Sequence, residues 1–177
     1  MEQLALAFAL LSQMASPSKP FSVQFVAEQS GRTVQVCLNG TKVETCFAGK
    51  LGFRDGKNSW TSVCGAVHSP VRLGQAFPVV ACRTTVVGGG VKIAGNIAAK
   101  YFKAAVTPDQ CAGLQLAVWE AIEDAGSRPD FHSGRFQANA SPAVLGYAAQ
   151  YYQAATTPGT AIFLQTGNSG QSQVTVT

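Results

Sequence analysis

The chain has 177 residues, of which 46% are hydrophobic and only 12% are charged, about half the charged share of an average soluble domain. This low charge, together with 18 glycines, excludes a coiled coil, an acidic disordered tail and a long charged helical scaffold. The net charge of +4 comes from 13 Lys and Arg residues that are spread along the chain, so nucleic acid is not an expected partner. No apolar run reaches the roughly 18 residues that a membrane-spanning helix needs, so we expect no embedded membrane segment.

Residues 1–20 form a distinct segment at the amino terminus. Its apolar run from Leu4 to Leu11 is followed by small and polar residues, which resembles the hydrophobic and cleavage regions of a secretory signal. Glu2 stands where such a signal usually carries basic residues. Two interpretations stay open: a signal-like segment, or an N-terminal amphipathic helix that packs on the domain.

Residues 21–87 have the pattern of β-strands. Asn39-Gly40 is a strong signal for a two-residue hairpin turn, and apolar and polar residues alternate on both sides of it. The expected strands are Ser22–Val26, Thr33–Leu38, Lys42–Phe47 and Trp60–Val67.

The five cysteines are an odd number and contain no C-x-x-C pair, so a structural metal site is not expected. A two-residue hairpin loop would place Cys37 opposite Lys42 and Cys46 opposite Thr33. The two cysteines would then lie about 13 Å apart along one face, since a strand rises about 3.3 Å per residue. That separation is too large for a disulfide in the hairpin.

Residues 88–158 have the composition and spacing of helices. The three glycines Gly88–Gly90 interrupt the strands and form a hinge into this part. Thr107-Pro-Asp-Gln110 is a strong helix start, because Thr can cap the helix, Pro suits the first turn and Gln follows three residues after the cap. The expected helices are Val91–Ala105, Thr107–Asp124 and Ser141–Ala155.

Strands return in residues 160–177, as Ala161–Gln165 and Gln171–Val176. Strands before and after a helical block predict an α+β fold, in which a β-sandwich or barrel (residues 21–87 and 160–177) carries an inserted helical subdomain of about three helices (residues 88–158).

The expected helix 107–124 carries an unusual glutamine. At about 100° per residue, one apolar stripe contains Cys111, Leu114 and Val118, whereas Glu120 falls on the opposite side. Gln115 lies inside the stripe. A buried amide without partners costs about 1–3 kcal/mol, so Gln115 is either hydrogen-bonded to backbone across a strand or has a chemical role.

The segment Leu114-Gln-Leu-Ala-Val-Trp-Glu120 resembles the glutamine motif of bacterial thioester domains of the Cys–Gln type. The glycine-containing approach to Trp60-Thr-Ser-Val-Cys64 resembles the family's cysteine region, and Gly170-Gln-Ser-Gln-Val-Thr its closing strand. The resemblance implies a thioester pair of Cys64 and Gln115, with Leu114, Val118 and Trp119 as supporting residues.

The resemblance also implies a function. Such domains are secreted or displayed at the cell surface, and they act as adhesins that attach covalently to host or matrix molecules. A thiolate attacks the Gln side-chain carbonyl and expels ammonia, and an amine on a target protein or surface ligand later takes the acyl group as an amide. The chemistry needs no cofactor and consumes the protein in one event, so we expect a reactive adhesin rather than an enzyme with turnover.

Several alternatives stay open. Cys111 lies one helical turn before Gln115 and is a rival partner for it, although the link would be a strained short loop. A disulfide between Cys82 and Cys111 is a hypothesis for an oxidising compartment. His68 and His132 are candidates for proton transfer.

Two other function classes compete with the thioester. Cys64 with either histidine would suit a cysteine hydrolase. Val63, Gly65 and Ala66 depart from the family's pattern around the cysteine, so a passive β-rich binding domain that kept the fold without the bond is the other alternative.

Overall fold

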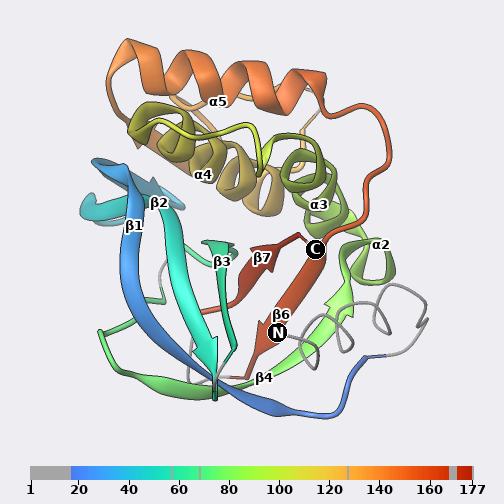
Figure 1. The fold of residues 1–177 in the computed structure, drawn as a ribbon. Coiled ribbons are helices and arrows are strands. Elements are labelled where there is room, and N and C mark those ends of the chain that lie inside the picture. The colour runs from blue at the N-terminus through green and yellow to red at the C-terminus, as the bar shows by residue number, and fades with distance from the viewer. Residues whose placement is uncertain (1–16, 57, 68, 127, 168–170, 177) are drawn as a thin grey trace.

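The computed structural model describes residues 17–56, 58–67, 69–126, 128–167 and 171–176. Within them the fold is α+β, with an antiparallel sheet on one side and helices gathered on the other (Figure 1). The strands are β1 (Phe21–Leu38), β2 (Glu44–Asp55), β3 (Asn58–Cys64), β4 (Ala76–Arg83), β5 (Phe136–Asn139), β6 (Ile162–Thr166) and β7 (Gln173–Thr175). The helices are α2 (Thr84–Val87), α3 (Gly89–Tyr101), α4 (Pro108–Glu123) and α5 (Pro142–Ala154).

The sheet closes on itself because β1 is long enough to pair on both sides. The strand order is β2-β3-β7-β6-β4-β1-β5, and β1 also pairs with β2. Two register shifts bend β1 near Phe25 and Gly31, and Gly31 pairs with Gly49 of β2. A Cβ at Gly31 would lie 2.1 Å from the Ala48 carbonyl oxygen, so only glycine allows the two strands to approach this closely.

The helical block confirms the local helix signals. Thr107 accepts a hydrogen bond from the Gln110 amide, and the Gln110 side chain bonds back to Thr107, which forms the predicted capping box. Ser141 caps α5 in the same way, through the Val144 amide. The glycine hinge lies where α3 begins, and Gly88 has a φ of 77°.

Two expectations about strands need correction. The turn at Asn39-Gly40 forms, with φ values of 55° and 63°, but the ladder pairs Val34 with Cys46, one residue away from the predicted register. The physical reason is that β2 begins only at Glu44, so the connection between Val36 and Glu44 is one residue longer than a two-residue loop gives. The end of β1 also pairs with β5 on its other side, where Cys37 lies opposite Gln137. β4 lies within residues 21–87, which were predicted to be β-stranded, although no strand was named at this position. β5 was not expected, because it lies inside the block predicted to be helical.

Helix α4 is the centre of the core. It contacts β1, β2 and β3 on one side and α3 and α5 on the other, and every residue from 111 to 121 is buried. A helix surrounded by protein on all sides needs small residues where a neighbouring backbone comes close. Gly113 is that residue against α5, since a Cβ there would lie 2.6 Å from Tyr147 Cβ and 3.1 Å from the Val144 carbonyl oxygen.

We therefore expect Gly113→Ala to lower the free energy of unfolding by about 1–3 kcal/mol, because the added methyl group forces α4 and α5 apart. Gly146 on α5 is the matched control, since a Cβ there would meet nothing within 4 Å. Gly146→Ala should raise stability by up to about 1 kcal/mol through helix propensity. Urea unfolding measures both, and equal effects of the two substitutions would contradict the close helix contact.

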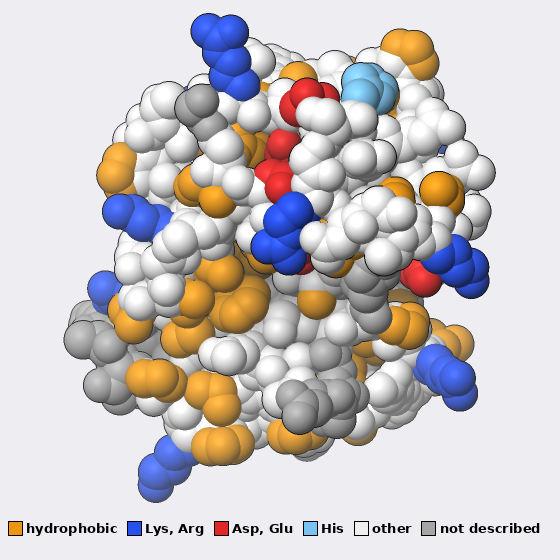
Figure 2. Space-filling view, turned by 180° about the vertical axis from the view of Figure 1, so that it is seen from behind, with side chains coloured by type: hydrophobic (Ala, Val, Ile, Leu, Met, Phe, Trp, Pro, Cys, Tyr) orange, Lys and Arg blue, Asp and Glu red, His pale blue; other side chains and the backbone are white. Residues whose placement is uncertain are grey.

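Residues 1–16 of the signal-like segment lie outside the described residues. In the described part of the chain, no helix is long and apolar enough to traverse a lipid bilayer. Figure 2 shows that the Lys and Arg side chains on one face stand apart from one another and form no continuous basic patch.

Candidate functional site: the Cys64–Gln115 pair

The structure brings Cys64 and Gln115 together in the core. The Gln115 carbonyl oxygen Oε1 accepts a hydrogen bond of 2.7 Å from the Cys64 amide, and its Nε2 donates one of 2.7 Å to the Cys64 carbonyl. The two residues are 2% and 1% exposed. The side-chain amide of one residue is therefore fixed against the backbone of the other, away from water.

Local structure explains how each residue reaches this position. Cys64 is the last residue of β3 and pairs with Gln173 of β7, so the strand ends at the site. Gln115 lies in the middle of α4, on the face that contacts β2 and β3. The chain bends after Cys64, and Gly65 suits this position because a Cβ would lie tightly against its neighbours, 3.0 Å from the Phe163 ring and 3.2 Å from the Ser172 carbonyl oxygen.

The Cys64 thiol is held by Ala66 and by an indole. Its Sγ donates to the Ala66 carbonyl oxygen at 2.8 Å and accepts from the Ala66 amide at 3.2 Å. Burial raises the pKa of Cys64 to about 12, although the Ala66 backbone and the Trp119 side chain oppose this rise. The thiol is therefore neutral at physiological pH.

Trp119 has a buried Nε1 with no hydrogen-bond partner of ordinary geometry among the described residues. The same indole lies close enough to Cys64 to lower the pKa of its thiol, so this N–H is available to a negative charge on the sulfur. Of the other two residues predicted to support the pair, Leu114 and Val118 are both fully buried. They exclude water from the helix face that carries Gln115.

A chain of buried polar side chains behind Cys64 was not foreseen. Ser62 donates to Gln173 Oε1 at 2.9 Å, and Gln173 Nε2 donates to Gln171 Oε1 at 3.1 Å. Gln171 in turn donates to the Ala66 carbonyl at 3.3 Å, the same oxygen that accepts the Cys64 thiol. Gln171 and Gln173 lie two residues apart at a strand, and this period-2 spacing was the available signal that both face the core.

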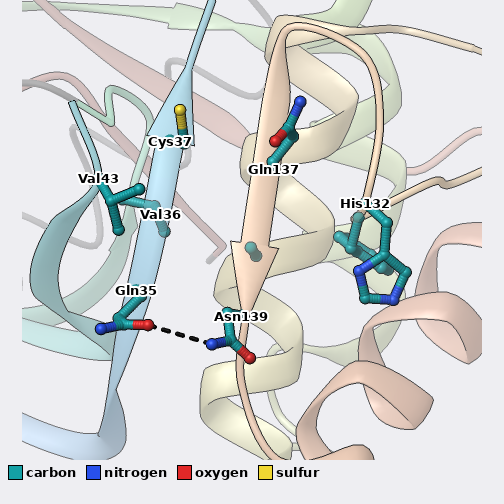
Figure 3. A pocket seen from close by; sticks show the side chains of 9 residues that line it. Gln35, Val36, Cys37, Val43, His132, Gln137 and Asn139 are labelled. Atoms are coloured by element: carbon teal, nitrogen blue, oxygen red, sulfur yellow. Dashed lines mark hydrogen bonds between the residues drawn. The ribbon is translucent and has the colours of Figure 1, made fainter. Parts of the chain in front are cut away.

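The two predicted histidines do not form a catalytic pair with Cys64 among the described residues. His68 lies outside them. His132 lines a cavity of about 240 Å³ at the seam of β1 and β5, which also contains Cys37 (Figure 3). The His132 ring lies beyond the strand that carries Gln137, and the Cys37 thiol donates to the Thr41 carbonyl instead.

The predicted disulfide between Cys82 and Cys111 is absent, since all five cysteines are described and all are free. Cys82 bonds to the Phe163 carbonyl and Cys111 to the Ala105 carbonyl, so the thiols face different segments. Cys111 is also not placed as the partner of Gln115, whose amide is held entirely by Cys64.

Glu120 departs from its expected position on a polar far face, because that side of α4 is covered by protein. The residue is 2% exposed, its Oε1 accepts from the Asp130 amide at 2.9 Å, and its Oε2 has no hydrogen-bond partner within the described structure. Burial raises its pKa to about 7, and the neighbouring carboxylates of Asp124 and Asp130 add to the rise. Glu120 is thus a buried carboxyl that titrates near neutral pH.

No protein-family model, no curated protein and no solved structure matches this chain. In the described part of the chain, no three His, Cys, Asp or Glu side chains gather as they would around a metal ion. The inference of function therefore depends on the geometry of the Cys64–Gln115 pair and on the sequence motifs that carry its two members.

Proposed function

We propose that Cys64 and Gln115 form an internal thioester and that the protein uses it once, to attach covalently to an amine on a target. The observation that carries the proposal is the contact of the two residues in a buried site, with the Gln115 amide fixed on the backbone of Cys64. By its motifs, the chain would act as an adhesin that is secreted or displayed at a cell surface.

The reaction balances without a cofactor. The Cys64 sulfur attacks Gln115 Cδ, the C–S bond forms and the C–N bond breaks, and Nε2 leaves as ammonia with the proton that the thiol gives up. The Cys64 amide already donates to Oε1 at 2.7 Å, so it can stabilise the negative charge that develops on this oxygen during attack. The Ala66 amide and the Trp119 indole can stabilise the thiolate.

Burial has opposite effects on the two halves of this chemistry. It keeps the thiol protonated, which slows the attack, but it also keeps water from the product, which slows hydrolysis. A bond that forms once in the lifetime of the protein tolerates a slow attack. A bond that must wait for its target does not tolerate fast hydrolysis.

Intact mass spectrometry tests the proposal directly. We expect the purified protein to be lighter than its sequence mass by one ammonia, and to gain one molecule of methylamine when this amine is added. Cys64→Ala should remove both the deficit and the methylamine adduct. Cys111→Ala is the control, because Cys111 is equally buried yet bonds to Ala105, and it should keep both.

A passive domain is the second candidate function, and one observation favours it. Both hydrogen bonds of Gln115 to the Cys64 backbone are what a purely structural glutamine would make. If the purified protein has its full sequence mass and this mass does not change when methylamine is added, the thioester proposal is wrong and the passive domain takes its place.

A further inference from the structure

A cavity of about 290 Å³ lies beside the Cys64–Gln115 pair. Two of its lining residues connect it to the pair. Trp119 lies against the Cys64 thiol, and Gln171 donates to the Ala66 carbonyl that holds this thiol. Neither Cys64 nor Gln115 lines the cavity itself, so Trp119 and Gln171 are the residues that lie between it and the pair.

The walls of the cavity suit an aliphatic chain. Besides Trp119, its apolar lining side chains include Phe25, Phe47, Leu51, Val67, Pro70 and Val71. A lysine side chain buries its four methylene groups along such surfaces while its amine extends beyond them. The cavity volume is also sufficient for one such side chain.

Two carboxylates, those of Glu28 and Glu44, line the cavity, and its described lining contains no Lys or Arg. The field of Glu44 acts inside the cavity, because burial and the Glu44 charge together raise the pKa of the neighbouring Cys46 to about 11. Carboxylates beside an apolar cavity attract cations and raise their local concentration by about tenfold or more.

We propose that this cavity admits the acceptor amine, and that Glu28 and Glu44 make the site selective for amines on a positively charged segment, such as a lysine in a basic stretch of a partner protein. The proposal rests on the thioester proposed above. In the transfer, the amine nitrogen attacks Gln115 Cδ, the new C–N bond replaces the C–S bond, and the proton lost by the amine returns to the Cys64 sulfur. The glutamates take no part in bond making and act as selectivity residues.

Two amines of matched length test the selectivity. Cadaverine keeps a second ammonium when one amine attacks, whereas 5-aminopentanoate carries a carboxylate at that end. Intact mass measures the rate constant of adduct formation for each amine. The rate constant for cadaverine divided by that for 5-aminopentanoate should be about tenfold or more lower in Glu28→Gln/Glu44→Gln than in the wild type. This ratio should also fall in the wild type as salt is added. Glu123→Gln is the control, since Glu123 pairs with Arg135 away from the cavity, and it should leave the ratio unchanged.

A binding measurement keeps the result separate from the thioester itself. The Cys64→Ala/Trp60→Phe variant cannot form the bond and retains Trp119 as its only tryptophan. We expect cadaverine to change its fluorescence saturably, 5-aminopentanoate to have no such effect, and the added Glu28→Gln/Glu44→Gln substitutions to remove it. Binding without a mass deficit would refute the thioester and support the cationic site. If the thioester forms, an unchanged rate ratio in the double variant would overturn this inference. The absence of cadaverine binding to the Cys64→Ala/Trp60→Phe variant would overturn it whether or not the thioester forms.

Discussion

Replacing Gln115 by Leu in a Cys64→Ala background should lower the free energy of unfolding by about 2–6 kcal/mol. Leu has nearly the volume of Gln but makes no hydrogen bond, so the amide and the carbonyl of residue 64 would both lose their partner in the core. Each buried backbone group left without a partner costs about 1–3 kcal/mol. Urea unfolding of the single and the double variant gives the difference.

The Cys64→Ala background is needed because it removes the thioester from the comparison and leaves the backbone partners of Gln115 in place. Gln153→Leu is the matched control, since Gln153 is exposed on α5, and it should change stability by less than about 0.5 kcal/mol. A similar small effect of Gln115→Leu would mean that water reaches the Cys64 backbone, which a dry reactive site does not allow.

Glu120→Gln should become more stable relative to the wild type as the pH rises from about 4.5 to 7. The pKa of Glu120 is raised from 4.5 to about 7 in the folded protein, so its contribution to stability is fully present below 4.5. It is lost as the pH rises, since the unfolded chain releases the proton first. The free energy of unfolding of Glu120→Gln, relative to that of the wild type, should rise by up to about 3 kcal/mol between low pH and pH 7, and should then stay constant at higher pH. Gln has no such titration and keeps an oxygen for the Asp130 amide.

Asp130→Asn should show the opposite pH dependence of stability, because the pKa of Asp130 is lowered in the folded protein whereas that of Glu120 is raised. Hydrogen bonds from Ser133 and His132 lower the pKa of Asp130 from its ordinary 3.8, so its ionised form favours the folded state. The stability that it contributes is lost only as the pH falls below about 4. Urea unfolding at a series of pH values measures both variants. A Glu120→Gln difference that does not change with pH would mean that this carboxyl is hydrated in the folded protein.

The hydrogen bonds of Gln115 also bear on the proposed bond. Thioester formation removes Nε2, so the Cys64 carbonyl would lose its donor, whereas the bond from the Cys64 amide to Oε1 can persist. An unpartnered buried carbonyl costs about 1–3 kcal/mol, so the closed thioester would retain some strain at Cys64. Aminolysis places an amide N–H at this position again, and this N–H can donate to the Cys64 carbonyl. The regained hydrogen bond favours transfer to an amine over hydrolysis of the thioester.

The local features of this protein were determined by its sequence alone. The Thr107 and Ser141 caps, the left-handed turn at Asn39-Gly40 and the glutamine on an apolar stripe of α4 all follow from interactions within a few residues. The α+β class followed as well, because strand and helix periodicities occupy separate stretches of the chain. The motif on α4 and the cysteine after a strand were sufficient to name Cys64 and Gln115 as candidates.

Only the tertiary structure decided how these pieces meet. The register of β1 on β2, the strand β5 and the choice of Cys64 rather than Cys111 beside Gln115 depend on contacts between distant segments, which no short window of sequence contains. The burial of Glu120 belongs to the same class. Periodicity places it opposite the apolar stripe, but α4 has protein on all sides, so a polar face in the sequence became a carboxyl in the core.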